Sequence, residues 1–137
     1  MLQRDYFIRL IEEFSAAISR FLTKKEDDLK RDKELKDLYK QYVGEYEDLR
    51  NLSVDELLKY AKEQWDEAER IDKINMVAEL LHAEASYKGQ PLRQILLEKA
   101  YALFYYVEAH GTTFSIDRQQ KMEAMRHELG NLLSENC

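Results

Sequence analysis

Apolar residues recur every three or four positions along most of the chain, which is the spacing of one face of an α-helix. In the first segment Phe7, Ile11, Phe14, Ile18 and Phe21 follow one another at intervals of 4, 3, 4 and 3 residues. This stripe predicts a long amphipathic helix over residues 3–24. Since no segment alternates with the period of two that a half-buried strand requires, the pattern predicts an all-α fold.

The next segment is more polar, and its apolar stripe is thinner. Leu35, Leu38, Tyr42, Tyr46 and Leu49 lie within a dense field of charged side chains. The spacing predicts a helix over residues 28–47, with a break after it at residues 51–52. The carboxylates at residues 26–28 suit the start of this helix, because they face the positive end of its dipole.

Turn and capping residues divide the remainder into further helices, and we expect five or six in all. Ser53 and Glu56 have the spacing of a capping box. Gly residues end helices and Pro cannot continue one, so both mark boundaries. The first of these predicted helices covers residues 54–64, and the second begins at Asp66 or Glu67 and is ended by Gly89 and Pro91. The third covers residues 92–109 and is ended by Gly111. The last covers residues 116–133, with Ser115 as its N-cap.

The helices are predicted to form a single domain over residues 1–137. Residues 1–50 supply a pair of helices, and residues 51–137 a region of helical hairpins. Short turns join the last three helices, so we expect them to pack as antiparallel neighbours with the first helix along them.

Two resemblances accompany this pattern. The first is carried by Arg4, Asp5, Tyr6, Arg9, Ile11, Glu12 and Phe14, and further along by residues 98–103, 106–108 and 113–118. On these residues the chain resembles an uncharacterised family of small bacterial all-helical proteins, which has no established activity to carry over.

The second resemblance is to tetratricopeptide-type repeats. Residues 67–133 are similar to such hairpins in their succession of helices and turns, with the small residues Ala78, Ala85 and Ala100 where helices approach. The fixed 34-residue repeat pattern is absent. The likeness implies protein binding by analogy of fold.

Charge and composition narrow the classes of function. The net charge is -6, and it is uneven: residues 1–25 carry five basic and three acidic side chains, and residues 26–72 carry nine and sixteen. Nucleic acid is a poor partner for such a chain, because phosphate binding needs a basic surface. The one cysteine is Cys137. No apolar run approaches the length of a bilayer span, and the N-terminus lacks the apolar centre of a signal peptide, so we expect a cytoplasmic protein.

The candidate chemistry is sparse, and we expect neither an enzyme nor a cofactor. No nucleophile elbow and no Gly-rich phosphate loop occur in the sequence. Glu79 and His82 lie one turn apart on a predicted helix, as in half of a di-iron motif. Because a complete site needs a second such pair, an ordinary helix-surface pair is the main interpretation, and a metal or small-ligand site in the bundle is an alternative.

Aromatic residues give the functional hypothesis. Tyr is favoured at protein interfaces, and it also packs at the rim of a protein's own core. Residues 104–106 are three consecutive aromatics, so at least one of them is expected to point outward. The interaction candidates are Phe7, Phe14, Tyr39, Tyr42, Tyr46, Tyr105 and Tyr106.

The sequence therefore favours a non-enzymatic protein-binding scaffold or a homo-oligomer, such as a homodimer. Two observations leave alternatives open. The cluster Asp66, Glu67, Glu69 and Asp72 is either a solvated helix start or a site for a cation or basic peptide. The first helix, with its basic residues Arg4, Arg9, Arg20, Lys24 and Lys25, is also compatible with association at an anionic membrane surface.

Overall fold

A computed structural model describes residues 2–135, with side-chain detail for residues 5–131. Cys137 and the side chains of Arg4 and Leu132 lie outside these residues. The described part is all-helical, and it contains α1 (Leu2–Thr23), α2 (Asp28–Tyr42), α3 (Tyr46–Leu49), α4 (Val54–Gln64), α5 (Glu67–Ala85), α6 (Leu92–His110) and α7 (Ile116–Glu135).

The predicted helix over residues 28–47 is divided in two, which makes seven helices in residues 2–135 rather than five or six. Asp27 caps the start of α2 by accepting from the backbone N–H of Lys30. At the other end the N–H groups of Val43 and Gly44 both donate to the carbonyl of Tyr39. Gly44 then has φ +151°, a conformation that favours glycine, and the chain turns into the four-residue α3.

The later boundaries agree closely with the capping residues. Ser53 and Glu56 form the predicted capping box at α4, and Ser115 accepts from the backbone N–H of Arg118 at the start of α7. Asp66 precedes α5, and α6 ends at His110 before Gly111. Helix α5 ends at residue 85, before the predicted Gly89 boundary, because residues 86–91 form the turn into α6.

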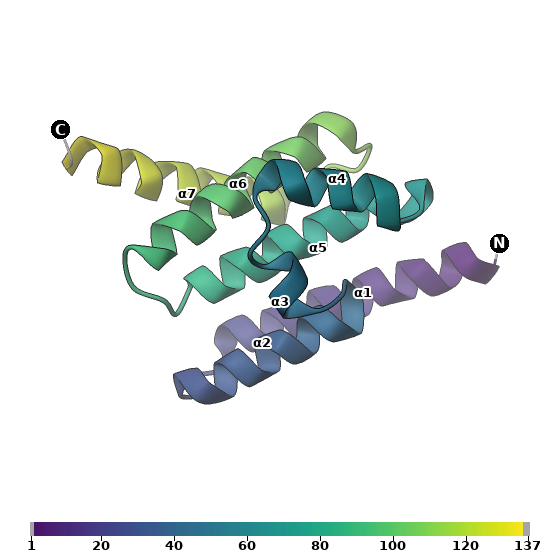
Figure 1. Cartoon of the computed structure of the whole chain (residues 1–137), viewed down its shortest axis with the longest axis horizontal. Helices are drawn as coiled ribbons and strands as arrows, with labels where there is room; N and C mark the ends of the chain where they lie inside the picture. The colour runs from purple at the N-terminus through teal and green to yellow at the C-terminus, as the bar shows by residue number, and fades with distance from the viewer. Residues whose placement is uncertain (1, 136–137) are drawn as a thin grey trace.

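Helix α5 lies at the centre of the molecule. It packs against α1, α2, α4 and α6, and α6 in turn carries α7 (Figure 1). Consecutive helices α5 and α6 lie side by side and run in opposite directions, and α1 and α2 form a second antiparallel pair below them (Figure 1). The tetratricopeptide-like character of these hairpins stays a prediction.

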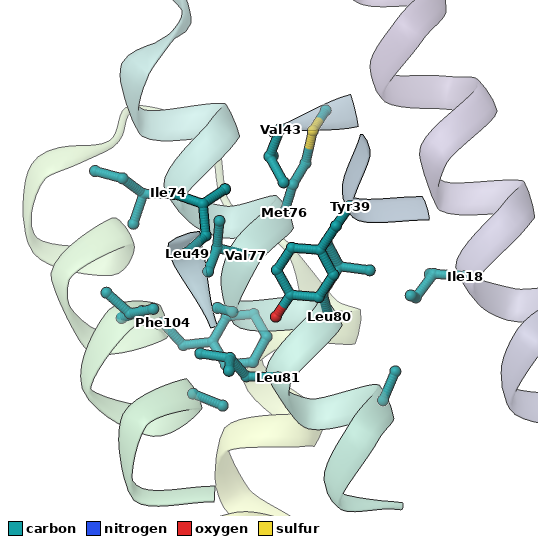
Figure 2. Packing of buried hydrophobic residues seen from close by; sticks show 14 of the residues in the cluster. Ile18, Tyr39, Val43, Leu49, Ile74, Met76, Val77, Leu80, Leu81 and Phe104 are labelled. Carbon is teal, nitrogen blue, oxygen red and sulfur yellow. The ribbon is translucent and has the colours of Figure 1, made fainter. Parts of the chain in front are cut away.

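The central position of α5 explains its composition. Nearly all of its second half is buried, including Val77, Leu80 and Leu81, so it is apolar on several faces rather than on one stripe. Around it, Figure 2 shows Ile18 from α1, Tyr39 from α2 and other side chains converging on one cluster. This cluster joins residues 1–50 to residues 51–137. The interior therefore fixes the relative positions of α1 and α5, between which the groove described below opens.

Candidate ligand groove

Most of the predicted interaction residues lie inside the molecule. Phe7, Phe14, Tyr39 and Tyr42 are all buried, and the rings of Phe14 and Tyr42 meet edge to face with centroids 5.2 Å apart. The stripe of the first helix thus packs against the rest of the chain. Tyr39 and Tyr42 therefore offer little surface to a partner.

Tyr46 belongs to a polar cluster under the surface. Its hydroxyl donates to Glu84 over 3.2 Å, and Arg50 binds the same carboxylate through Nε and Nη2 at 3.1 and 2.8 Å. Glu84 is only 1% exposed, so its charge depends on these partners. Burial, followed by the charge of Glu84, raises the pKa of Tyr46 to about 12. The cluster fastens α3 to α5 and offers no open surface.

The three consecutive aromatics on α6 behave as predicted. Phe104 is fully buried, Tyr106 is half-buried and Tyr105 is 63% exposed. Tyr106 stacks on His110, whose Nδ1 lies 3.0 Å from the carbonyl of Tyr106. Tyr105 is therefore the exposed member of the predicted set.

Glu79 is buried and His82 is half-buried, so the prediction of an ordinary helix-surface pair is wrong. The carboxylate of Glu79 accepts from Lys121 of α7 over 2.5 Å, and burial raises the pKa of this carboxyl. The ring of His82 has Nδ1 buried without a partner among the described residues, and burial lowers its pKa to about 4. Within residues 5–131 no three metal-ligating side chains gather in one place. The positive charge of Lys121 compensates the negative charge of Glu79.

An open cavity of about 500 Å³ lies where α1, α5 and the α6–α7 connection meet. This volume is in the usual range for ligand sites. Apolar side chains from α1, α5 and α6 line one part of it: Phe7, Ile8, Ile11, Ile71 and Val107. The α6–α7 connection contributes Gly111, Thr112 and Thr113.

The start of α5 gives this cavity an acidic rim. Asp66, Glu67, Glu69 and Asp72 all line it. Glu69 pairs with Lys73 over 3.6 Å, whereas Asp66 and Glu67 are exposed and take part in no ion pair within the described residues. The α5 dipole offsets about half of one charge. The rim therefore stays negative.

A second cavity of about 250 Å³ adjoins the first, and Ile11 and Asp72 line both. Here Lys121 lies between Glu79 and Asp117, 2.5 and 3.0 Å from their carboxylates. Asn75 also lines this cavity, and its Oδ1 is buried without a hydrogen-bond donor among the described residues. An acceptor without a donor carries a free-energy cost that a bound donor would relieve. We refer to the two cavities together as the α1–α5 groove.

The charges along the groove are unequal. Its basic residues are Arg118 and Lys121, against six acidic ones: Asp66, Glu67, Glu69, Asp72, Glu79 and Asp117. Arg118 already donates to Glu108 and, over 2.7 Å, to the carbonyl of Thr113. Because Glu108 is outside the lining, it neutralises Arg118 without using a groove carboxylate. The groove as a whole is acidic.

Some segments that line the groove also carry exposed apolar side chains. Ile8 of α1 lines the groove and is 43% exposed. Phe114 follows the lining residue Thr113 in the sequence and is 71% exposed. Ile116 at the start of α7 is also largely exposed. Of these three residues, Ile8 is the one that lines the cavity itself. The sequence pattern singled out the acidic residues of this site, but not Ile8, Ile71 or Asn75.

None of the helices in residues 2–135 is both long enough and apolar enough to cross a membrane. Comparison of the chain with protein-family models, with curated proteins and with solved structures gives no match in any of the three.

Proposed function

We propose that this chain is a non-enzymatic binding module that holds a segment of a partner protein in the α1–α5 groove. The observation that carries the proposal is the coincidence of an open cavity of about 500 Å³ with an exposed apolar side chain, Ile8, in its lining. An amphipathic helix laid in a groove is a common mode of peptide recognition, in which the groove covers the apolar face. The hairpins α5, α6 and α7 act as its rigid frame, in the manner of tetratricopeptide-like scaffolds.

The core supports a frame of this kind. Helix α5 supplies Ile71 to the groove and the neighbouring Ile74 to the buried cluster, so one wall of the groove is anchored in the interior. A site built on packed helices holds its shape better than one built on loops. In this proposal the protein acts in the cytoplasm, and in a bacterial cell if the sequence resemblance holds.

The test places a photo-crosslinking amino acid, p-benzoylphenylalanine, at Ile8 in the groove and, as a matched control, at Leu29. Leu29 is 84% exposed on α2 and does not line the groove. After irradiation in the native cells, the proposal predicts a protein adduct from the Ile8 position and none from Leu29. Equal adducts from both positions, or no adduct from Ile8, would contradict it.

The same experiment distinguishes a homo-oligomer from a hetero-partner. If the adduct at Ile8 has twice the mass of the chain and yields only its own peptides, the occupant of the groove is a second copy. Light scattering behind a sizing column would then show a dimer at micromolar concentrations. A hetero-adduct with a monomeric free protein would assign the groove to another protein.

A further inference from the structure

Given the proposed function, on which this step rests, we infer that the α1–α5 groove is built for a cationic amphipathic segment, with one Lys or Arg side chain donating to Asn75. The segment lies with its apolar face on Ile8, Ile11 and Ile71 and its basic side chains against the start of α5. This occupant satisfies three separate features of the groove.

The first feature is the rim charge. Asp66 and Glu67 are exposed, take part in no ion pair within the described residues, and lie at the mouth of the cavity. Like charges placed side by side repel one another, and a bound cation would remove that repulsion. Charge complementarity of this kind sets the choice of partner and speeds association.

The second feature is the apolar floor. Ile11 of α1 and Ile71 of α5, both only partly buried, line the same cavity as the exposed Ile8. A small inorganic cation or a polyamine would satisfy the rim but would leave this surface in contact with water. A segment with a basic and an apolar face covers both, and burial of apolar area supplies most of the affinity of a helix in a groove.

The third feature is the unsatisfied acceptor. Asn75 Oδ1 lies in the second cavity, which adjoins the first through Asp72 and Ile11. Lys and Arg are donors only, so either can donate to this oxygen without a competing acceptor. The charge of Lys121 does not oppose such an entry, because Glu79 and Asp117 bind it on both sides.

The test is fluorescence anisotropy with three labelled synthetic peptides of about 14 residues, which is four helical turns. The first is an amphipathic peptide of Leu and Lys. The second has every Lys replaced by Glu, and the third has every Leu replaced by Ser. We expect saturable binding of the first peptide only, weakened by added salt as exposed charges are screened.

Three protein variants locate the binding. Asp66→Asn with Glu67→Gln is expected to weaken binding of the Leu–Lys peptide about tenfold by removing two rim charges. The matched control, Asp28→Asn with Asp37→Asn, removes two exposed carboxylates from α2 and is expected to change affinity less than about twofold. Asn75→Leu is expected to weaken binding about fivefold with the fold intact, because no hydrogen bond within the described residues uses its Oδ1.

Several outcomes would overturn the inference. These are equal binding of the Glu peptide, equal binding of the Ser peptide, no binding of the Leu–Lys peptide, or equal loss in the groove and control variants. An unchanged affinity in Asn75→Leu would remove the role of Asn75. If no cationic peptide bound while Ile8 still formed its specific adduct, the groove would bind protein of other chemistry. If neither occurred, the proposed function itself would fall.

Discussion

Tyr39 and Tyr46 are neighbours with opposite hydrogen-bonding situations. Their rings meet edge to face, with centroids 5.2 Å apart. The hydroxyl of Tyr46 donates to Glu84, whereas that of Tyr39 is buried with no partner among the described residues. Both residues were predicted as interface candidates from their type and spacing. Spacing shows that they share a side of the chain, but it does not show whether another helix covers that side.

Replacing each tyrosine by Phe is therefore expected to have opposite effects. Tyr39→Phe removes an unsatisfied buried hydroxyl and should leave the free energy of unfolding unchanged or raise it by up to about 1 kcal/mol. Tyr46→Phe removes a hydrogen bond to a buried carboxylate and should lower it by about 1 kcal/mol. Urea denaturation followed by circular dichroism measures both. An equal loss in the two variants would show that the hydroxyl of Tyr39 has a partner.

The pair Arg50 and Glu84 makes a stronger prediction. Glu84 is 1% exposed, and Arg50→Met would leave its carboxylate buried without its cation. Loss of one partner of a buried pair costs roughly 3 kcal/mol or more. In the double variant Arg50→Met with Glu84→Gln, the uncompensated charge is gone, so much of that stability should return. A cost below about 1 kcal/mol for Arg50→Met would indicate that water reaches the pair.

His82 predicts a pH dependence. Burial first, then the charges of Lys121 and Arg93, lower its pKa from 6.5 to about 4. Between these values the unfolded chain holds a proton on His82 that the folded protein does not. The free energy of unfolding should therefore fall as the pH drops from 6.5 to 4, by up to about 1.4 kcal/mol per pH unit from this group.

His82→Gln isolates this contribution. Burial raises the pKa of Glu79, which makes an opposite contribution, but that contribution is present in both proteins. The difference between the denaturation midpoints of the two proteins should grow in favour of the variant as the pH falls below 6.5. Parallel curves from pH 6.5 to pH 4 would contradict the burial of the ring.

At the scale of the elements, the turns differ in how strictly they require glycine. Gly44 has φ +151°, and a Cβ there would lie 3.2 Å from Cδ1 of Leu49. Gly130 lies within α7, and no described atom is within 4 Å of its hypothetical Cβ. Glycine has a poor helix propensity, so replacing Gly130 should raise the free energy of unfolding.

The pair of Gly→Ala variants tests this difference. Gly44→Ala should lower the free energy of unfolding by about 1 kcal/mol or more, because Ala rarely adopts that backbone conformation. Gly130→Ala should raise it by up to about 1 kcal/mol. Thermal denaturation compares the two. A stable Gly44→Ala protein would show that the α2–α3 turn can adopt another conformation.

Local signals predicted the elements well where one residue caps one helix. Ser53 with Glu56, Asp66, Gly111 and Ser115 all mark observed boundaries. The break between α2 and α3 was missed, because the apolar spacing continues through it to Leu49 while the backbone turns at Gly44. The spacing of apolar residues does not reveal a turn when the apolar residues after the turn are still buried.

At the scale of the whole molecule, the groove could not be predicted from the sequence. Its walls come from α1, α5 and the α6–α7 connection, and Ile8, Ile71 and Thr113 are far apart along the chain. The acidic cluster at the start of α5 was visible, and a basic peptide was among its interpretations, but a charge run in a helical protein is usually a solvated face. The neighbouring cavity and the unpaired Asn75 Oδ1 depend on how the helices pack, which the sequence pattern does not show.

Binding of a cationic amphipathic segment in the α1–α5 groove can be observed residue by residue. The most direct test is a map of backbone amide shifts in ¹⁵N-labelled protein as the Leu–Lys peptide is added. We predict that the changes gather in the first half of α1, the first turns of α5 and residues 111–118, and that α2 stays unchanged. Changes centred on α2 or on the exposed face of α6 around Tyr105, or none at saturating peptide, would contradict the claim.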